Sequence, residues 1–308
     1  MQVPITLQKQ IFPIAVTKEF RGSLVPFEIK SYKEDFENSK KGGFFDLSDW
    51  GVVEISGPDA ADYLQRMSTV NMKKLAQDEL VDGAFLTGRG TVVLLGSFIK
   101  KSEDRFWFCV SPQQIERALE HLEQFHFQEK LEIKNLTSEL AVVGVWKDGY
   151  GQEIVPRSEL ETTLKKWNQG GLSFLGMHLY HFFRIQRGTP WLGWEVGDSD
   201  LILEASMERA VARNKGCYPG QEVVERIFTY GQVNRKLMRV VCELPVLGQL
   251  PETPQEVRDG ESVVGKLMSV VQDPEDDRRA WGLAYIKKGF WEKTEPFFLN
   301  SGNPIRIC

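Results

Sequence analysis

Alternating apolar and polar side chains predict a strand near residue 50, followed by an amphipathic helix. Val53 and Ile55 flank Glu54, which is the two-residue period of a half-buried strand. After a Ser-Gly-Pro-Asp turn, apolar residues recur at three- and four-residue spacings over residues 60–67, as on one face of a helix. The stretch therefore predicts a β-α unit, and we expect a turn between Gly43 and its strand.

Further strands and one helix follow in a regular order. They are predicted at residues 83–99 (two strands around a Gly-Arg-Gly turn), 106–110, 112–125 (the helix), 131–134 and 140–146. The strand at 106–110 is apolar throughout, which indicates burial on both faces. The helix after it begins at a Ser-Pro pair, a common N-cap and first-turn combination. The order β-α-β-β-α-β is typical of ferredoxin-like units in an α+β fold.

The C-terminal part of the chain has short apolar segments separated by Pro, Gly and charged residues. A helix at 159–167 precedes it, and strands are predicted at 236–242, 263–271, 280–286 and 304–307, with a charged turn at 273–279. Several short strands with loops between them predict a small β-barrel.

Composition narrows the class of protein. The 308 residues are 42% hydrophobic and 26% charged, as in soluble globular proteins, and the net charge of −5 gives no overall attraction to nucleic acid. We expect no direct nucleic-acid partner and no membrane association, because no apolar segment is long enough to span a bilayer. The four cysteines form no Cys-x-x-Cys pair, so we expect neither a metal site nor disulfides, which suits the cytoplasm.

The run Arg-Asn-Lys-Gly-Cys-Tyr-Pro-Gly-Gln-Glu at residues 213–222 concentrates the chemistry of the chain. Its glycines and proline predict a stiff loop that exposes Cys217. Lys215 lies two residues from the thiol, and a nearby cation favours the reactive thiolate. A surface turn that happens to contain a cysteine fits the same residues equally well on physical grounds alone.

This run resembles the signature of the YgfZ family, the folate-binding relatives of the glycine-cleavage T protein (aminomethyltransferase). Downstream residues also match, and weaker similarity runs from about Gly43 to about Lys288. The resemblance implies a T-protein-like folate-binding domain of two ferredoxin-like halves over residues 42–235 and a C-terminal β-barrel over 236–308. Residues 1–41 lie outside it as an N-terminal extension, predicted as extended or loop structure with a helical turn at 33–37.

The resemblance also implies a function and a cofactor. We expect a tetrahydrofolate-binding protein that uses Cys217 and Lys215 to support iron–sulfur enzymes or their assembly proteins, including enzymes of tRNA modification. The candidate cofactor-binding residues are Arg184, Gln186, Tyr218, Gln221, Glu222 and Arg226. Gln186 stands where the T protein has an acidic residue that contacts the pterin, so folate should bind more weakly here. Arg184 has a second interpretation as a surface residue facing solvent.

Two other functions stay open. One is an aminomethyltransferase, but Val93-Leu94-Leu95-Gly96 has no carboxylate where the T protein places its catalytic acid. The other is a non-catalytic protein whose loop docks a partner. The residues therefore leave open whether the chain is an enzyme.

Among the cysteines we expect Cys217 to be the most reactive. Cys109 lies in an apolar strand and should be buried. Cys242 is expected to be half-buried near a strand end, and Cys308 to be accessible, with the terminal carboxylate disfavouring its thiolate.

Overall fold

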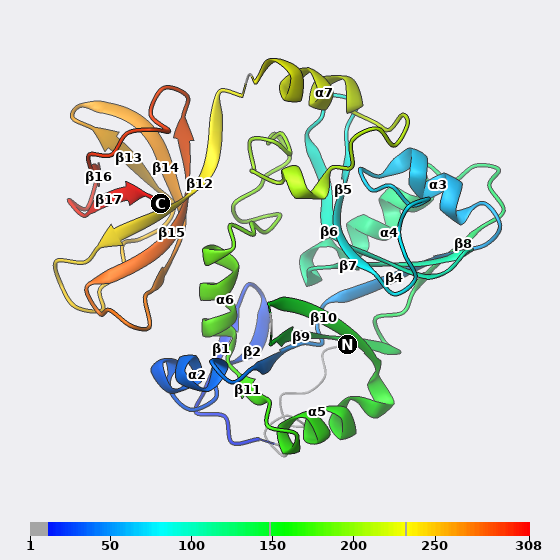
Figure 1. Cartoon of the computed structure of the whole chain (residues 1–308), viewed down its shortest axis with the longest axis horizontal. Helices are drawn as coiled ribbons and strands as arrows, with labels where there is room; N and C mark the ends of the chain where they lie inside the picture. The colour runs from blue at the N-terminus through cyan, green and yellow to red at the C-terminus, as the bar shows by residue number, and fades with distance from the viewer. Residues whose placement is uncertain (1–11, 148, 232) are drawn as a thin grey trace. The chain divides into compact units, whose positions relative to one another are not determined.

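The structure is a computed structural model that describes residues 12–147, 149–231 and 233–308 (Figure 1). The chain divides into two compact units, which are described one at a time. The first unit comprises residues 1–84, 94–180 and 212–218, and the second comprises residues 85–93, 181–211 and 219–308.

A five-stranded sheet forms one half of the first unit, in the strand order β5-β6-β7-β4-β8. Its elements are β4 (Gly51–Ser56), α3 (Ala60–Met67), β5 (Leu80–Leu86), β6 (Val92–Ser102), β7 (Arg105–Val110), α4 (Ile115–Gln124) and β8 (Glu132–Asn135). The spatial order β6-β7-β4-β8 is that of a ferredoxin-like βαββαβ unit, with β5 added at the edge. This arrangement confirms the α+β prediction for this segment.

Buried side chains hold the two helices of this half together. Tyr63 of α3 is 1% exposed, and its hydroxyl donates a 2.6 Å hydrogen bond to the carbonyl oxygen of Leu122 in α4. Phe98 of β6 stacks on Phe108 of β7 with ring centroids 4.4 Å apart. The packing fixes α3, which later supplies the polar side chains of the candidate site.

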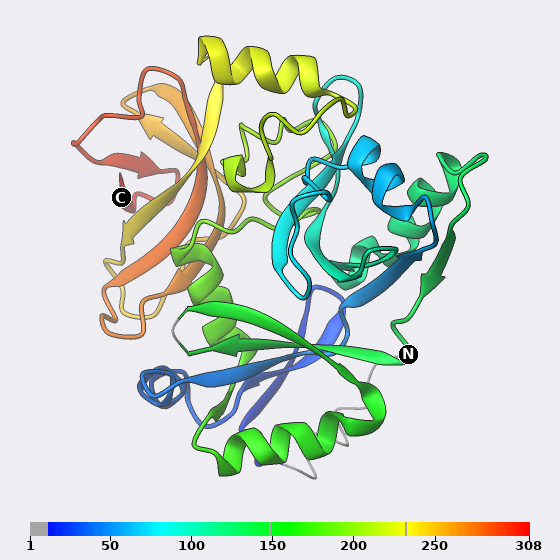
Figure 2. The ribbon, with the colours of Figure 1, turned by 45° about the vertical axis from the view of Figure 1, so that its right-hand side comes forward.

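A four-stranded sheet forms the other half of the first unit, in the order β10-β9-β3-β11. Its elements are β3 (Gly43–Leu47), β9 (Leu140–Trp146), β10 (Tyr150–Pro156), α5 (Leu160–Gln169) and β11 (Ser173–Leu175). Figure 2 shows α5 lying along one face of this sheet, where Leu160 and Leu164 pack against Phe44 and Phe174.

Three strands of this sheet depart from the sequence prediction. The turn expected after Gly43 is wrong, because residues 43–47 form β3 and every one of them is buried. Strands β10 and β11 were not predicted. Neither strand shows a clear alternation of apolar and polar residues, and β10 has no buried residue. They form because they pair with β9 and β3, which the local pattern does not reveal.

The N-terminal segment has more regular structure than the sequence indicates. A hairpin of β1 (Val16–Phe20) and β2 (Ser23–Glu28) precedes α2 (Tyr32–Ser39). Ser31 caps this helix, since its hydroxyl accepts a hydrogen bond from the backbone N–H of Glu34. The expected helical turn at 33–37 is thus a two-turn helix, and residues 1–11 lie outside the described part.

The C-terminal strands of the second unit close into a six-stranded barrel in the order β12-β15-β14-β13-β16-β17. They are β12 (Arg235–Glu243), β13 (Gln255–Asp259), β14 (Ser262–Gln272), β15 (Arg279–Lys287), β16 (Phe297–Leu299) and β17 (Pro304–Ile307). Pairing of β12 with β17 closes the barrel. The predicted barrel is confirmed, although β13 and β16 were not identified from the sequence.

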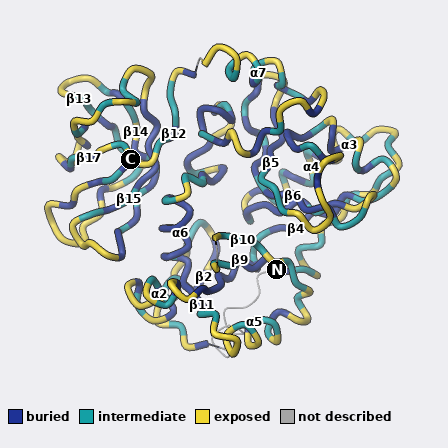
Figure 3. Tube along the Cα trace, viewed as in Figure 1, coloured by how far each residue is buried: buried dark blue, intermediate teal, exposed yellow. Residues whose placement is uncertain are grey.

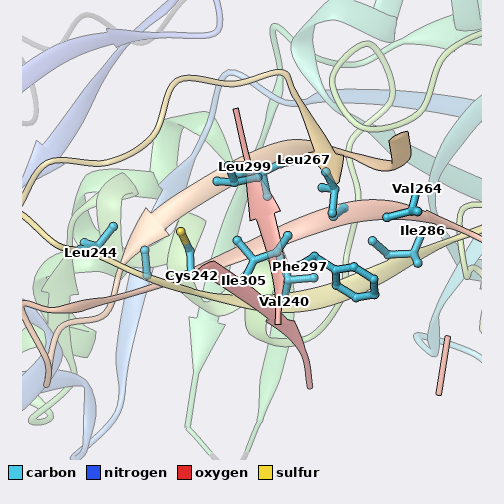
Figure 4. Packing of buried hydrophobic residues seen from close by; sticks show 12 residues of the cluster. Val240, Cys242, Leu244, Val264, Leu267, Ile286, Phe297, Leu299 and Ile305 are labelled. Atoms are coloured by element: carbon cyan, nitrogen blue, oxygen red, sulfur yellow. The ribbon is translucent and has the colours of Figure 1, made fainter. Parts of the chain in front are cut away.

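The barrel encloses its own hydrophobic core (Figure 4). The residues labelled there are Val240, Cys242, Leu244, Val264, Leu267, Ile286, Phe297, Leu299 and Ile305. Cys242 is 0% exposed, so the expectation that it would be half-buried is wrong: its position in β12 points it into the barrel. The charged turn before β15 is held by Asp273, whose carboxylate accepts hydrogen bonds from Arg279 and Trp281.

Two further helices carry candidate site residues. Helix α6 (Met177–Gln186) is buried over most of its length (Figure 3), whereas α7 (Gln221–Tyr230) has one buried residue, Val224. None of the helices in the described ranges has the length and apolar character needed to cross a membrane.

Candidate functional site

The loop before α7 has a backbone that depends on three positions with positive φ. Asn214 (φ 59°), Gly216 (φ 96°) and Gly220 (φ 81°) all lie in the left-handed region. A Cβ at Gly220 would come within 2.6 Å of the carbonyl oxygen of Thr87, so this position also requires glycine for space. The loop ends there, and Gln221 begins α7; the expectation that the loop would extend through residue 222 is therefore wrong.

Lys215 anchors this loop to α3 through Gln65. The side-chain amide of Gln65 donates a hydrogen bond to the carbonyl oxygen of Lys215, and the Lys215 ammonium donates one to the carbonyl oxygen of Gln65. Lys215 Nζ also lies 5.0 Å from the ring centroid of Tyr218, a cation–π distance. Lys215 is only 7% exposed and Tyr218 also 7%, so both side chains face the protein.

Burial changes the protonation of Lys215. It lowers the pKa of the ammonium from its ordinary 10.5 to about 8, while the nearby Cys217 acts in the opposite direction. Lys215 is therefore a group that loses its proton slightly above neutral pH. That behaviour suits a side chain that exchanges protons near a reactive atom.

Cys217 is exposed and lies at a cavity of about 600 Å³. Side chains and backbone of three segments line it: Asp59, Asp62, Gln65, Arg66, Lys73, Gln128, Glu129, Lys215, Gly216 and Cys217. All ten belong to the first unit. The sequence prediction of an exposed cysteine on a glycine-opened loop agrees with this geometry.

Charges of both signs surround the cavity. Arg66 pairs with Glu129 at 2.9 Å, and Lys73 pairs with Asp62 at 3.1 Å. The Arg66 guanidinium, together with the backbone N–H groups of Phe127 and Gln128, lowers the pKa of Glu129 to about 2. The side chains of Asp62 and Lys73 are 71% and 66% exposed, so their pair is screened by solvent and readily replaced by a ligand.

The other cysteines have different surroundings. Cys109 and Cys242 are both 0% exposed, and burial raises the pKa of each thiol to about 12. Cys308 is exposed at the chain end, and partial desolvation raises the pKa of its thiol. The expected effect of the terminal carboxylate is thus not the leading cause.

Arg184 lies in a buried cluster in the second unit. Its guanidinium donates to Nδ1 of His181 (2.9 Å), the carbonyl oxygen of Thr189 (3.1 Å) and Oε1 of Glu195 (2.8 Å). Arg184 is 2% exposed and Glu195 0%, so the interpretation of Arg184 as a solvent-facing residue is wrong.

This cluster holds two tryptophans in place. The guanidinium carbon of Arg184 lies 4.4 Å from the ring centroid of Trp191 and 4.7 Å from that of Trp194. Glu195 also accepts a 2.8 Å hydrogen bond from the backbone N–H of Trp191. All three donor-bearing nitrogens of Arg184 are therefore engaged within the protein, and its role is to position its neighbours.

The remaining predicted residues lie on the two helices of the second unit. Gln186, the last residue of α6, is partly exposed, and its backbone carbonyl accepts a 2.8 Å hydrogen bond from Arg239. On α7, Gln221 is partly exposed, whereas Glu222 and Arg226 are exposed. Of the residues predicted from the sequence, the structure thus brings together Lys215, Cys217 and Tyr218 in the first unit.

Sequence reasoning missed the partners of the loop. Gln65 and Lys215 are 150 residues apart, and nothing in either local pattern predicts their contact. A polar residue on the otherwise apolar face of α3 was the available signal, since buried Gln65 interrupts that face. Among the described residues, no group of three or more His, Cys, Asp or Glu side chains could hold a metal ion.

The fold and sequence define the class of protein. Residues 27–146 match the GCVT N-terminal domain. The chain is 30% identical over 322 residues to the aminomethyltransferase of Bacillus pumilus, covering 89% of this chain and 87% of that protein. It therefore belongs to the aminomethyltransferase (GCVT) family.

Two other relatives show how far the similarity extends. A chloroplastic protein of Arabidopsis thaliana, whose name assigns it to the transferases only provisionally, is 25% identical over 288 residues, and the match covers 79% of this chain but 65% of that protein. The crystal structure of glycine cleavage system aminomethyltransferase T from Bartonella henselae superposes with a TM-score of 0.84 at 13% identity. It covers 97% of this chain and 94% of that one, which establishes the fold.

Proposed function

We propose that this chain is a YgfZ-like, tetrahydrofolate-binding member of the family that supports iron–sulfur enzymes in the cytoplasm through Cys217. The observation that carries the proposal is the exposed thiol of Cys217 at a 600 Å³ cavity, on a loop that Lys215 anchors to α3. A thiol that is exposed, held by a rigid backbone and close to a cation can bind or transfer a metal or sulfur species. The clients would include enzymes of tRNA modification.

Lys215 supports this chemistry through its charge. Its ammonium interacts electrostatically with Cys217, and a nearby cation generally makes a cysteine more reactive. The other cysteines are poorer candidates, since Cys109 and Cys242 are buried and Cys308 is at the chain end.

The second unit is the proposed place of the pterin contacts. Gln186 is partly exposed and offers an amide that can donate and accept hydrogen bonds. Arg184 cannot supply a free guanidinium, because its nitrogens are already bound within the protein. The donor set therefore fits a pterin without a charged partner, which favours modest affinity. Tyr218, Gln221, Glu222 and Arg226 stay predicted contacts, and the domain boundaries at 42 and 236 stay predictions.

An aminomethyltransferase is the second candidate, because the Bacillus pumilus relative carries that name. Strand β6 argues against it. Residues 92–102 contain no carboxylate, and Leu94 is 0% exposed and Leu95 8%. An aliphatic side chain cannot transfer a proton, and general acid–base help is typically worth about 10²–10⁴-fold in rate. A docking protein without chemistry is the third candidate.

One experiment separates these functions. Cells that lack the gene for this chain are complemented with the wild type, with Cys217→Ser or with Cys308→Ser as the matched control, and a tRNA-modifying iron–sulfur enzyme is assayed. We expect the wild type and Cys308→Ser to restore its activity and Cys217→Ser to fail. Full activity with Cys217→Ser, at equal protein levels, would point instead to the transferase or docking function.

A further inference from the structure

We propose that the cavity at Cys217 accepts small zwitterionic disulfides, amino-acid-like molecules with both a carboxylate and an ammonium group, and that Cys217 captures one half of them as a mixed disulfide. This inference rests on the proposed role of Cys217 as a reactive thiol and identifies the class of molecule that reaches it.

The size and lining of the cavity favour a small polar molecule. Its volume of about 600 Å³ lies within the range of roughly 300–1,000 Å³ found for small-molecule sites. The ten lining residues are charged or polar apart from Gly216 and Cys217 itself. A protein partner would bury its contact around an apolar centre, which these residues do not offer.

The charges around the cavity come in both signs and differ in how firmly they are held. Arg66 and Lys73 are 59% and 66% exposed, and each has one carboxylate partner across a solvated contact. Glu129 also accepts two backbone hydrogen bonds, so it stays in place, while Asp62 is 71% exposed. A ligand carboxylate can therefore displace Asp62 from Lys73 or bind the Arg66 guanidinium beside Glu129, and the ligand ammonium can pair with Asp62. A ligand with one sign of charge would leave the opposite set unmatched.

The capture step is a thiol–disulfide exchange. The exposed Cys217 thiol gives its proton to water, and the thiolate attacks one sulfur of the disulfide. The S–S bond of the ligand breaks, a new S–S bond forms with Cys217, and the other half leaves as a thiolate. That thiolate takes up a proton from water, so the exchange balances. The bound disulfide is the oxidant, and no further reactant is needed.

The test compares two disulfides on the purified full-length chain. Rates of Cys217 modification are measured by mass spectrometry with cystine, which is zwitterionic, and with bis(2-hydroxyethyl) disulfide, which carries no charge. The variant Arg66→Gln/Lys73→Gln removes the two exposed cations, and Lys40→Gln/Lys165→Gln removes two exposed lysines elsewhere as a charge-matched control. Each rate is divided by the rate with iodoacetamide, a neutral probe of the thiol itself.

We expect the cavity variant to lose roughly tenfold in its normalised rate with cystine, the size that two partly screened ion pairs allow, and to keep its rate with the uncharged disulfide. The control variant should match the wild type with both. The inference is overturned if the cavity variant loses the same factor in its normalised rate with both disulfides, or loses none with either. In that case a fast reaction with iodoacetamide would still support a reactive thiol at Cys217. A slow iodoacetamide reaction in the wild type overturns the proposed role of Cys217 as well. Melting temperatures of all variants show that they are folded.

Discussion

Gln65 and Lys215 bind each other in both directions, each side chain donating a hydrogen bond to the backbone carbonyl of the other residue. The pair joins α3 to the loop that carries Cys217, although 150 residues separate them in the chain. Both residues are buried, Gln65 at 8% and Lys215 at 7% exposure. The position of the thiol is therefore set by a contact with another part of the fold, in addition to the loop's own glycines.

Replacing Gln65 by leucine should loosen the loop. The substitution removes the donor to Lys215 and leaves a buried carbonyl oxygen unpaired, which typically costs about 1–3 kcal/mol. We expect the free energy of unfolding to fall by that amount in urea denaturation. Gln128→Leu is the control, since Gln128 lines the same cavity but is exposed. Equal stability of the two variants would mean that the reciprocal contact contributes nothing.

Lys215 should increase the alkylation rate of Cys217 by a factor that depends on pH. Below about pH 8 Lys215 is an ammonium, a nearby cation that generally makes a cysteine more reactive, and above it the charge is lost. Lys215→Gln should therefore slow alkylation of Cys217 by roughly two- to fivefold at pH 7, as a partly screened charge interaction allows, and much less at pH 9.5. Lys165→Gln, a change on the exposed face of α5, is the control. A constant ratio of rates across this pH range would contradict the prediction.

The same pKa shift affects stability with a definite sign. The folded state holds the pKa of Lys215 at about 8, below its ordinary 10.5, so protonation favours the unfolded chain. The cost is fully present below pH 8 and disappears as the pH rises toward 10.5. Lys215→Gln should accordingly flatten the rise in stability between these two values.

Removing Arg184 should destabilise the second unit strongly. Arg184→Met leaves the fully buried carboxylate of Glu195 without its cation, and breaking such a pair typically costs about 3–5 kcal/mol. Arg187→Met is the control, because Arg187 is exposed on the same segment. Urea denaturation measures both variants. A double variant, Arg184→Met/Glu195→Leu, should recover part of the loss, since no uncompensated charge stays behind.

Reduced folate should bind with modest affinity. Binding of tetrahydrofolate at one hundred times its dissociation constant would raise the free energy of unfolding by about 2.7 kcal/mol. Gln186→Glu should bind more tightly, because a charged acceptor makes stronger hydrogen bonds to the pterin. Calorimetric titration measures both. If millimolar tetrahydrofolate produces neither heat nor a shift in melting temperature, the folate-binding proposal is contradicted.

The strands of the barrel differ in how well the local sequence predicts them. Strands β12, β14 and β15 were predictable because each is a short, mainly apolar segment bounded by charged residues or turns. Strand β13 has one buried residue, Val257, in a polar segment, so only its pairing with β14 and β16 makes it a strand. The local sequence pattern identifies strands that have enough apolar residues to be recognised. It fails for a strand such as β13, which forms only because it pairs with neighbouring strands.

The same limit applies to the candidate site. Cys217 and Lys215 were identifiable because they are close in the sequence and their glycine-rich surroundings are unusual. Gln65 and Arg66 were not, since they come from a helix far away in the chain. Arg184 was assigned to the cofactor site from the family resemblance, which cannot reveal that Glu195 and two tryptophans enclose it.

The measurement that tests the central claim most directly is the alkylation rate of each cysteine across a pH series, resolved by mass spectrometry. We expect Cys217 to react first near neutral pH, because its thiol is exposed beside Lys215. Cys308 should follow, and Cys109 and Cys242, whose burial raises the pKa of each thiol to about 12, should react last. Labelling of Cys217 no faster than that of Cys109 or Cys242 would contradict the reactive-thiol function.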